Sequence, residues 1–219
     1  MVDIDNLVDN AWRNDAVVQS IEEMYQLATN DYIMEGTEGL NHTESQAEWL
    51  KGNAVFIPCG IWLENEMKEM IPEGFNMVIN QSPGPGNGCR AEGGEPFIVP
   101  SKAENVLAGI EYLRCIISKE SSKYFAVNVS AMMPVIGGTE GVTISTGMQS
   151  AVEMVEVCGD NVFPGMRYGG WYSDLSKEVS AKMGDLLTKR ITPAEFIDAS
   201  QAMADKVKAD PEVTKFTRE

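Results

Sequence analysis

The sequence predicts an α/β protein that is mostly helical and has a few short strands. In several stretches apolar residues recur every three or four positions, as on the buried face of a helix, whereas short β-branched and aromatic runs are typical of strands. Of the 219 residues, 43% are hydrophobic and 23% are charged, which is ordinary for a chain with a buried core. Because no repeat recurs along the chain, we expect one domain over residues 1–219.

Start signals and apolar stripes mark the helices. Asn14 or Asp15 caps a predicted helix that runs to about Thr29. Three tetrapeptides are typical of capping boxes, at 43–46, 101–104 and 192–195. The strongest stripe belongs to the helix expected from about Glu104 to Lys119, where we expect Leu107, Ile110 and Leu113 to be buried. Further helices are predicted over about 62–71, 151–158 and 173–187 and from 193 onward.

Three short apolar runs are predicted strands: Ala54–Pro58, Phe75–Ile79 and Pro96–Pro100. The first run passes through Cys59 and Gly60 directly into the next predicted helix, so Trp62 stands at a strand-to-helix turn. We expect Trp62 to have a partly exposed face at a concave surface, because ligands commonly bind at such element ends. Two glycine-rich stretches, 83–94 and 163–171, are predicted loops.

The charge of the chain excludes two classes of partner. It has 17 Lys and Arg against 33 Asp and Glu, and its net charge of −16 repels nucleic acid and anionic membranes. The longest apolar run, residues 54–63, contains Pro58 and is shorter than the roughly 20 residues that cross a bilayer. The acidic N-terminus lacks the basic and apolar regions of a secretory signal, and the sequence alone leaves the compartment open.

The four cysteines are 30, 26 and 43 residues apart, without the close pairs of a zinc site. In an oxidising compartment four cysteines allow three sets of disulfide pairs. Cys115, however, lies within an apolar helical stripe and Cys59 within an apolar run. We therefore expect buried free thiols.

Residues for covalent catalysis or cofactor binding are poorly represented. His42, the one histidine, stands in a polar stretch and is predicted to be a solvated loop residue, and no serine has the context of a nucleophile elbow. The glycines at 84, 86 and 88 lack the helix and lysine of a phosphate cradle. Carboxylate pairs such as Glu64 and Glu66 leave a glycan-hydrolysing enzyme open. We expect no cofactor and no metal.

Two aromatic segments favour a sugar ligand. The first, Gly60–Glu66, contains Trp62 and Glu64, and the second, Arg167–Tyr172, contains Trp171. Pyranose rings stack their C–H faces on flat aromatic rings, while carboxylate, amide and guanidinium groups form hydrogen bonds with the hydroxyls. From spacing alone, both tryptophans could equally be core residues.

Several segments resemble the extracellular solute-binding proteins of bacterial ABC sugar importers. The run Glu48–Met67 resembles the family's passage from a helix through Gly-Lys-Ala-Ala-Met and a strand to Gly-x-Trp. Phe97–Asn105, with the helix that follows, resembles its Pro-Ser-Lys-Ala turn, and Leu187–Phe196 resembles its C-terminal segment. Within the first run, Trp-Leu-Glu-Asn-Glu-Met is most similar to binding proteins for N-acetylglucosamine and its short oligomers.

The resemblance implies one lobe of a periplasmic-binding-protein-like fold of type II. It covers nearly the whole sequence but only the second half of a typical family member, so we expect the C-terminal lobe without the first lobe. It implies a carbohydrate-binding component of an importer, not an enzyme, which closes on its sugar and is recognised by permease subunits. It also implies an extracellular or periplasmic location, with membrane contact only through the permease or a lipid anchor.

The same resemblance places the ligand at the glycine-tryptophan turn and at the late aromatic loop. The binding residues that it implies are Gly60, Trp62, Tyr168 and Trp171, and the two aromatic segments add Glu64 and Arg167. Cys59 departs from the family pattern, in which a glycine or another small residue is usual. Two other functions stay open from the residues themselves: a glycan-active enzyme, and an acidic helical interaction module without a small-molecule site.

Overall fold

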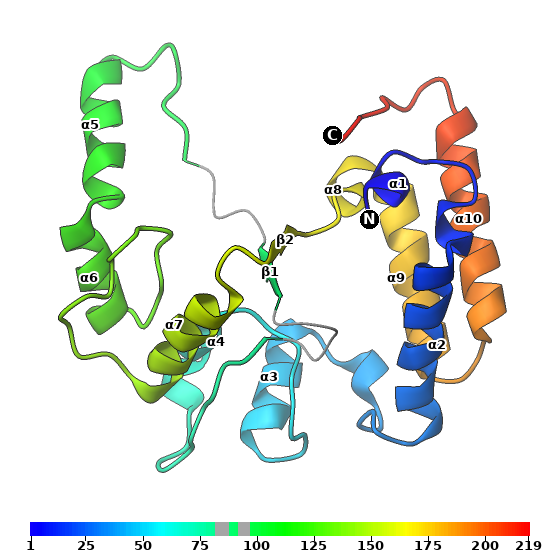
Figure 1. Ribbon diagram of the computed structural model, residues 1–219, viewed down its shortest axis with the longest axis horizontal. Helices are drawn as coiled ribbons and strands as arrows, with labels where there is room; N and C mark the ends of the chain where they lie inside the picture. The colour runs from blue at the N-terminus through cyan, green and yellow to red at the C-terminus, as the bar shows by residue number, and fades with distance from the viewer. Residues whose placement is uncertain (82–87, 92–96) are drawn as a thin grey trace. The chain divides into compact units, whose positions relative to one another are not determined.

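A computed structural model describes residues 1–81, 88–91 and 97–219, and it confirms a mostly helical chain with short strands (Figure 1). Among the described residues, the helices are α1 (Val2–Asp5), α2 (Asp15–Thr29), α3 (His42–Leu50), α4 (Leu63–Met67), α5 (Val106–Ile116), α6 (Lys119–Asn128), α7 (Thr146–Cys158), α8 (Tyr168–Trp171), α9 (Ser173–Leu187) and α10 (Pro193–Ala209). The strands are β1 (Cys89–Ala91) and β2 (Val162–Pro164). Two compact units result, residues 1–41 with 165–219 and residues 42–164. The single domain expected from the sequence stays a prediction.

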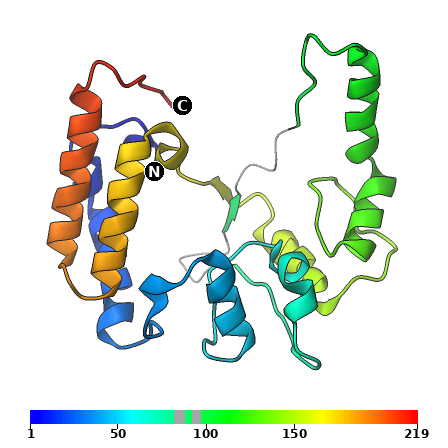
Figure 2. The ribbon, with the colours of Figure 1, turned by 180° about the vertical axis from the view of Figure 1, so that it is seen from behind.

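The first unit is built around three long helices, α2, α9 and α10, which lie side by side in both ribbon views (Figures 1 and 2). Their apolar stripes meet in one core, where Leu175, Leu186 and Phe196 are fully buried. Trp12 closes this core with its ring edge-on to Phe196, the two centroids 6.3 Å apart. The stripe that the sequence predicts for 173–187 is thus confirmed as a buried helix face.

Two of the predicted start signals cap their helices as expected. The Asn14 side chain accepts a hydrogen bond from the Ala16 amide, 3.0 Å away, at the start of α2. Thr192 and Glu195 form a full capping box at the start of α10, in which each side chain accepts from the other residue's backbone N–H. The hydrogen bond from the Thr192 amide lowers the pKa of Glu195, so the box needs the ionised carboxylate.

The other two capping boxes are wrong. α5 begins at Val106, after the predicted box, and the Asn105 side chain accepts from the Ala108 amide instead. α3 begins at His42, before the predicted box, and the Gln46 side-chain nitrogen lies close to His42 Nε2 and donates to Glu66 Oε2 of α4. A capping residue forms its hydrogen bond with a backbone amide or a side chain that tertiary packing has left without a partner. The tetrapeptide alone does not determine which group that is.

The second unit has a smaller core where α3 and α4 meet. Trp49 and Leu50 from α3 pack with Leu63 and Met67 from α4 and with Met77, and all five are buried. The Ile79 amide donates a 2.8 Å hydrogen bond to the Ser150 hydroxyl of α7, which joins the segment containing Met77 to that helix. This core fixes the short helix that follows Trp62.

The predicted strands are wrong. Residues 54–58, 75–79 and 97–100 form no strand. Pro96 and residues 83–87 and 92–94 of the predicted loop at 83–94 lie outside the described residues. The observed strands lie instead in stretches predicted as loops, and they pair in parallel with Cys89 opposite Val162. A β-prone run becomes a strand only when a neighbour accepts its backbone hydrogen bonds, and none of these three runs has such a neighbour among the described residues.

The cysteines also differ from expectation. Cys89 and Cys158 form a disulfide that joins β1 to the C-terminal end of α7, with their Cα atoms 5.7 Å apart. Cys59 and Cys115 are free, as expected, but both are exposed rather than buried. The pairing of β1 with β2 brings the two half-cystines together, and that pairing has no local signal in the sequence.

The apolar face of α5 is not buried, contrary to the sequence-based expectation. No residue of this helix is buried, Leu107 is 75% exposed, and Ile110 is exposed while Leu113 is half-buried. The helix contacts α6 and approaches Val99, close to Gly109, where an added Cβ would lie 2.8 Å from a Val99 methyl group. In the part of the chain that the structure describes, these contacts cover only one side of α5.

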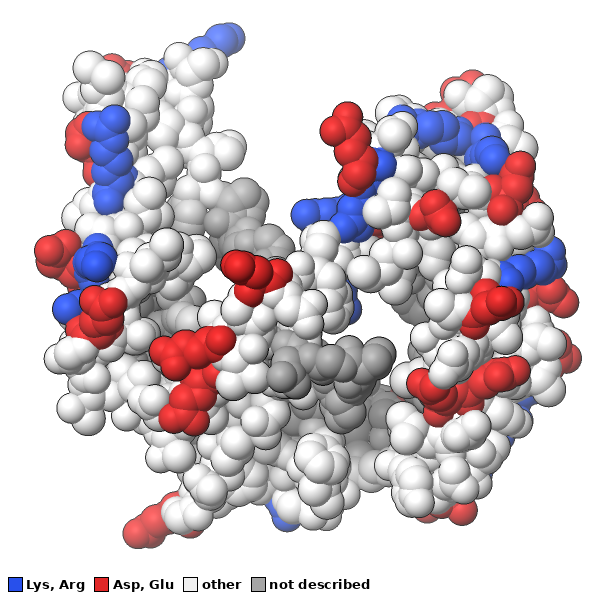
Figure 3. All heavy atoms as spheres, viewed as in Figure 1, with Lys and Arg blue, Asp and Glu red and all other residues white. Residues whose placement is uncertain are grey.

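The molecular surface carries its charges in small groups. Figure 3 shows Asp and Glu side chains spread over one face of both units, with Lys and Arg side chains between them. Within the described residues there is no helix with the length and apolar character needed to span a bilayer.

Two leucines that the sequence places on similar stripes should differ in their effect on stability. Leu186→Ala should lower the free energy of unfolding by about 2–5 kcal/mol, because it leaves a cavity in a full core. Leu107→Ala should change it by less than about 0.5 kcal/mol, because Leu107 is exposed. Urea unfolding followed by circular dichroism compares them. Equal losses would contradict the burial described above.

The disulfide predicts the number of reactive thiols. Of four cysteines, two should react with a thiol reagent in the unfolded, unreduced chain, and all four after reduction. Because the crosslink closes a long loop, Cys158→Ser should lower the free energy of unfolding by about 2–4 kcal/mol. Cys115→Ser, which removes an exposed free thiol, is the control and should have little effect. Four reactive thiols before reduction would refute the crosslink.

Candidate functional site

The residues implied by the sequence fall into two groups, one in each unit. Gly60, Trp62 and Glu64 belong to the unit of residues 42–164. The loop Arg167–Trp171, which holds the other three, belongs to the unit of residues 1–41 and 165–219. Each group has its own geometry.

Trp62 immediately precedes α4 and has an exposed ring. The side chains of Leu63 and Met67 anchor α4 in the core of the unit, whereas Trp62 is 47% exposed, which confirms the expectation of a partly exposed face. Its six-membered ring lies against Gly60 so closely that an added Cβ at Gly60 would overlap it. Gly60 is therefore needed where it stands, because any other side chain would displace the ring from its position.

The two carboxylates of α4 are held by different helices. Glu64 accepts a 2.7 Å hydrogen bond at Oε2 from the hydroxyl of Ser145, the residue that caps α7. Glu66 accepts a 2.8 Å hydrogen bond at Oε2 from the side-chain amide of Gln46 in α3. The short helix is thus fixed by polar contacts to α7 and to α3, in addition to its apolar contacts.

His42 is the first residue of α3 rather than a loop residue, which corrects the sequence-based expectation. Its Nε2 lies 2.9 Å from the Gln46 side-chain nitrogen and 3.3 Å from Glu66 Oε2. Gln46 is fully buried, and its amide nitrogen also lies 3.6 Å from the Cys59 sulfur. This polar cluster closes the turn that leads from Cys59 into α4.

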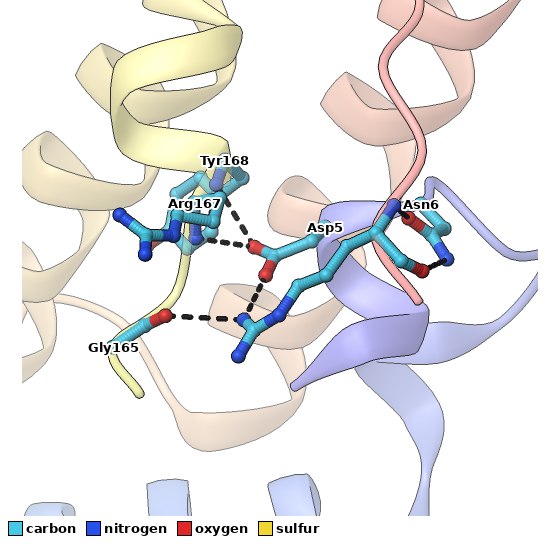
Figure 4. Close-up of polar contacts among 6 residues, drawn as sticks. Asp5, Asn6, Gly165, Arg167 and Tyr168 are labelled. Atoms are coloured by element: carbon cyan, nitrogen blue, oxygen red, sulfur yellow. Dashed lines mark hydrogen bonds and ion pairs between the residues drawn. The ribbon is translucent and has the colours of Figure 1, made fainter. Parts of the chain in front are cut away.

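The aromatic loop of the other unit is held by one buried carboxylate, Asp5 (Figure 4). Asp5 Oδ1 accepts hydrogen bonds from the backbone amides of Arg167, at 2.7 Å, and Tyr168, at 2.9 Å. Its Oδ2 accepts from the Arg218 guanidinium at 2.6 Å, and the same guanidinium nitrogen donates to the Gly165 carbonyl at 3.1 Å. Asp5 therefore fixes the backbone of the loop, while the Arg167 side chain is exposed.

The two aromatic residues of this loop are only partly available to a ligand. Tyr168 packs its ring edge-on to Trp12, 5.7 Å between centroids, and Trp171 stacks on Phe216, 5.3 Å between centroids. Trp171 also lines an open hollow of about 270 Å³ between the start of α9 and the end of α10, together with Asp174, Lys206 and other residues. The sequence left open whether the two tryptophans are core residues. Trp62 is not, because its ring is exposed, whereas Trp171 is half-buried and packs against the core of its unit.

Sequence reasoning missed the residues that support both groups: Ser145, Gly147, Gln46, Asp5 and Arg218. Each acts on a residue far away in the sequence; Ser145 and Glu64, for example, are 81 positions apart. A serine just before a helix is a capping signal, and that is the one local clue to Ser145. Among the described residues, no group of three or more His, Cys, Asp or Glu side chains is arranged to hold a metal ion.

Comparison with known proteins gives one informative match. No protein-family model matches the chain. The chain is 31% identical to the diacetylchitobiose binding protein NgcE of Streptomyces coelicolor over 224 aligned residues, which cover 97% of this chain and 47% of NgcE. The chain therefore spans about half the length of this curated relative. The resemblance to sugar-binding proteins that the sequence carries is confirmed by this match.

Because the ion pair of Asp5 is buried, we expect its loss to destabilise the protein more than the loss of an exposed ion pair does. Asp5→Ala should lower the free energy of unfolding by about 3–5 kcal/mol, because it leaves the largely buried Arg218 guanidinium without its partner. Asp9→Ala is the matched control; the pair of Asp9 with Lys208 is exposed, and its loss should cost about 1 kcal/mol or less. Thermal and urea unfolding measure both. Equal effects would show that Asp5 is not the anchor of the loop.

Proposed function

We propose that this chain, a homologue of sugar-binding proteins of bacterial importers, binds a carbohydrate for import. The observation that carries the proposal is the exposed Trp62 ring, held on Gly60 at the start of a helix whose other side is anchored in a core. A rigid, flat, exposed ring binds the C–H face of a pyranose at little cost in conformational entropy. The similarity to a diacetylchitobiose binding protein over 97% of the chain supports the same ligand class.

The ligand is a short oligomer of an N-acetylated hexosamine. Diacetylchitobiose offers apolar ring faces, hydroxyl groups and two acetamido groups but no charge, and each of these suits groups in this chain. Trp62 suits a ring face, and the carboxylate of Glu64 suits a hydroxyl or amide donor. The net charge of −16 disfavours an anionic sugar.

The protein acts as the binding component of an ABC transporter. A sugar-binding component outside the cell delivers its ligand to membrane permease subunits, so the extracellular or periplasmic side is the expected location. In the unit of residues 42–164 the sugar-binding residues are Gly60, Trp62 and Glu64, and in the other unit they are Arg167, Tyr168 and Trp171. Membrane association then arises through the permease or through a lipid anchor.

The chain forms one lobe of a longer, two-lobed protein. The chain covers 47% of the diacetylchitobiose binding protein, which is the share expected of one lobe of two. The first lobe is expected to supply the second wall of the sugar site. This chain alone should then bind sugar more weakly than the longer protein does.

A glycan-active enzyme is the alternative that the paired carboxylates of α4 leave open. Both carboxylates already accept hydrogen bonds from side chains of neighbouring helices, and the relative is named for binding. Incubation with diacetylchitobiose and longer chitin oligomers, followed by chromatography of the products, distinguishes the two functions. Unchanged oligomers together with saturable binding support the binding function.

Trp62→Ala should weaken the binding of diacetylchitobiose by about 1–3 kcal/mol, because it removes the stacking surface and the exclusion of water around it. The melting temperature should hardly change, since the ring is exposed. Isothermal titration calorimetry and thermal melts measure the two quantities. Tyr32→Ala removes another exposed aromatic ring, 75% exposed and outside the proposed site, and should leave the affinity unchanged. Unaltered affinity with a large fall in melting temperature would place Trp62 in the core.

A further inference from the structure

The carboxylate of Glu64 has a fixed position at the first turn of α7, between Ser145 and Gly147, which we call its seat. Ser145 caps this 13-residue helix: its hydroxyl oxygen accepts from the Met148 amide, 3.1 Å away, and its hydrogen is donated to Glu64 Oε2 at 2.7 Å. One hydroxyl therefore serves both the helix and the carboxylate. The positive end of the helix dipole favours a negative charge at this place.

Gly147 leaves the space that the carboxylate needs. A Cβ added at Gly147 would overlap Glu64 Oε2 and lie 3.3 Å from the carboxylate carbon. Gly147 lies within α7 and its φ is not positive, so the helix backbone would accept an alanine there. What an alanine would disturb is the position of Glu64, whose flexible side chain would move away.

The second oxygen of the carboxylate is available. In the part of the chain that the structure describes, Glu64 Oε1 makes no hydrogen bond, whereas Oε2 is held by Ser145. Glu64 is half-buried, and it stands two residues after the exposed Trp62. A carboxylate already fixed by one oxygen loses little further freedom when the other accepts a hydrogen bond from a ligand.

The geometry points to Ser145 and Gly147 as positioning residues for ligand recognition by Glu64. Together they hold Glu64 so that Oε1 accepts a hydrogen bond from a donor of the sugar, a hydroxyl or an acetamido N–H. This inference rests on the proposed sugar-binding function and adds to it the residues that set the direction of the acceptor. Neither positioning residue touches the ligand itself.

The first test compares two glycine substitutions in helices. Gly147→Ala should weaken the binding of diacetylchitobiose to the 219-residue chain about tenfold, the effect of losing one hydrogen bond to a charged group. Gly184→Ala in α9 is the matched control, because an added Cβ there meets nothing within 4 Å. Both variants should melt no lower than the unaltered chain, since alanine favours a helix more than glycine does. NMR titration measures the dissociation constants into the millimolar range.

Three substitutions at Ser145 separate capping from positioning. Ser145→Thr retains the hydroxyl and should retain the affinity. Ser145→Asp still caps α7 but has no hydrogen to donate and repels Glu64, so it should bind the sugar about tenfold more weakly with little change in melting temperature. Ser145→Ala removes both functions and should lower both quantities.

The outcomes distinguish this inference from the proposed function. Unaltered affinity in both Gly147→Ala and Ser145→Asp would overturn the inference alone, as would losses of affinity that follow equal losses of melting temperature. If the unaltered chain binds no diacetylchitobiose, the proposed function fails and the ligand role of Glu64 fails with it. The side-chain carboxyl ¹³C resonance of Glu64, measured without sugar, should shift in Gly147→Ala but not in Gly184→Ala, and an unshifted resonance refutes the seat itself.

Discussion

The buried carboxylate of Asp5 is the interaction on which the unit of residues 1–41 and 165–219 depends. It lies near one end of the chain, accepts hydrogen bonds from Arg218 near the other end, and holds two backbone amides of the loop between them. Asn6 adds two hydrogen bonds to the backbone of Arg218. A charge removed from water is tolerated only when its oxygens are satisfied, and here the partners come from two separate segments, the Arg167–Tyr168 loop and Arg218. The position of the aromatic loop is a consequence of that requirement.

In the second unit, Trp62 and Glu64 are positioned by the contacts of the short helix α4. α4 is too short to be stable alone, so its orientation is set by what surrounds it: a core on one side, and Ser145 and Gln46 holding its two carboxylates. Trp62 is then exposed because Leu63 and Met67 point inward. The exposed ring and the held carboxylates are therefore parts of one arrangement. A substitution in α7, far away in the sequence, is expected to change the positions of Glu64 and of the Trp62 ring.

The exposed apolar side chains have a common physical origin. α5 is mostly apolar, with Glu111 and Arg114 as its charged residues, and the β-prone run at 54–58 leaves Val55 and Phe56 exposed. Both are sequences that normally become buried, one as an internal helix and the other as a paired strand. The described residues leave both segments exposed.

The sequence by itself determined the features that depend on neighbours close along the chain. The long helices α2, α9 and α10, two of their caps and the buried stripe of α9 follow from spacing and from residues such as Asn14 and Thr192. The exposed position of Trp62 followed from the turn before it, and the sugar-binding resemblance followed from ordered motifs.

Tertiary structure alone decided the features whose partners are distant. Strand pairing put β1 and β2 where glycine-rich loops were expected and brought Cys89 to Cys158. The seat of Glu64 and the anchoring by Asp5 join residues 81 and more than 160 positions apart, and no periodicity records such contacts. Burial of α5 failed as a prediction for the same reason: an apolar stripe states that a helix seeks a partner, but whether that partner is present depends on the fold and on the length of the chain.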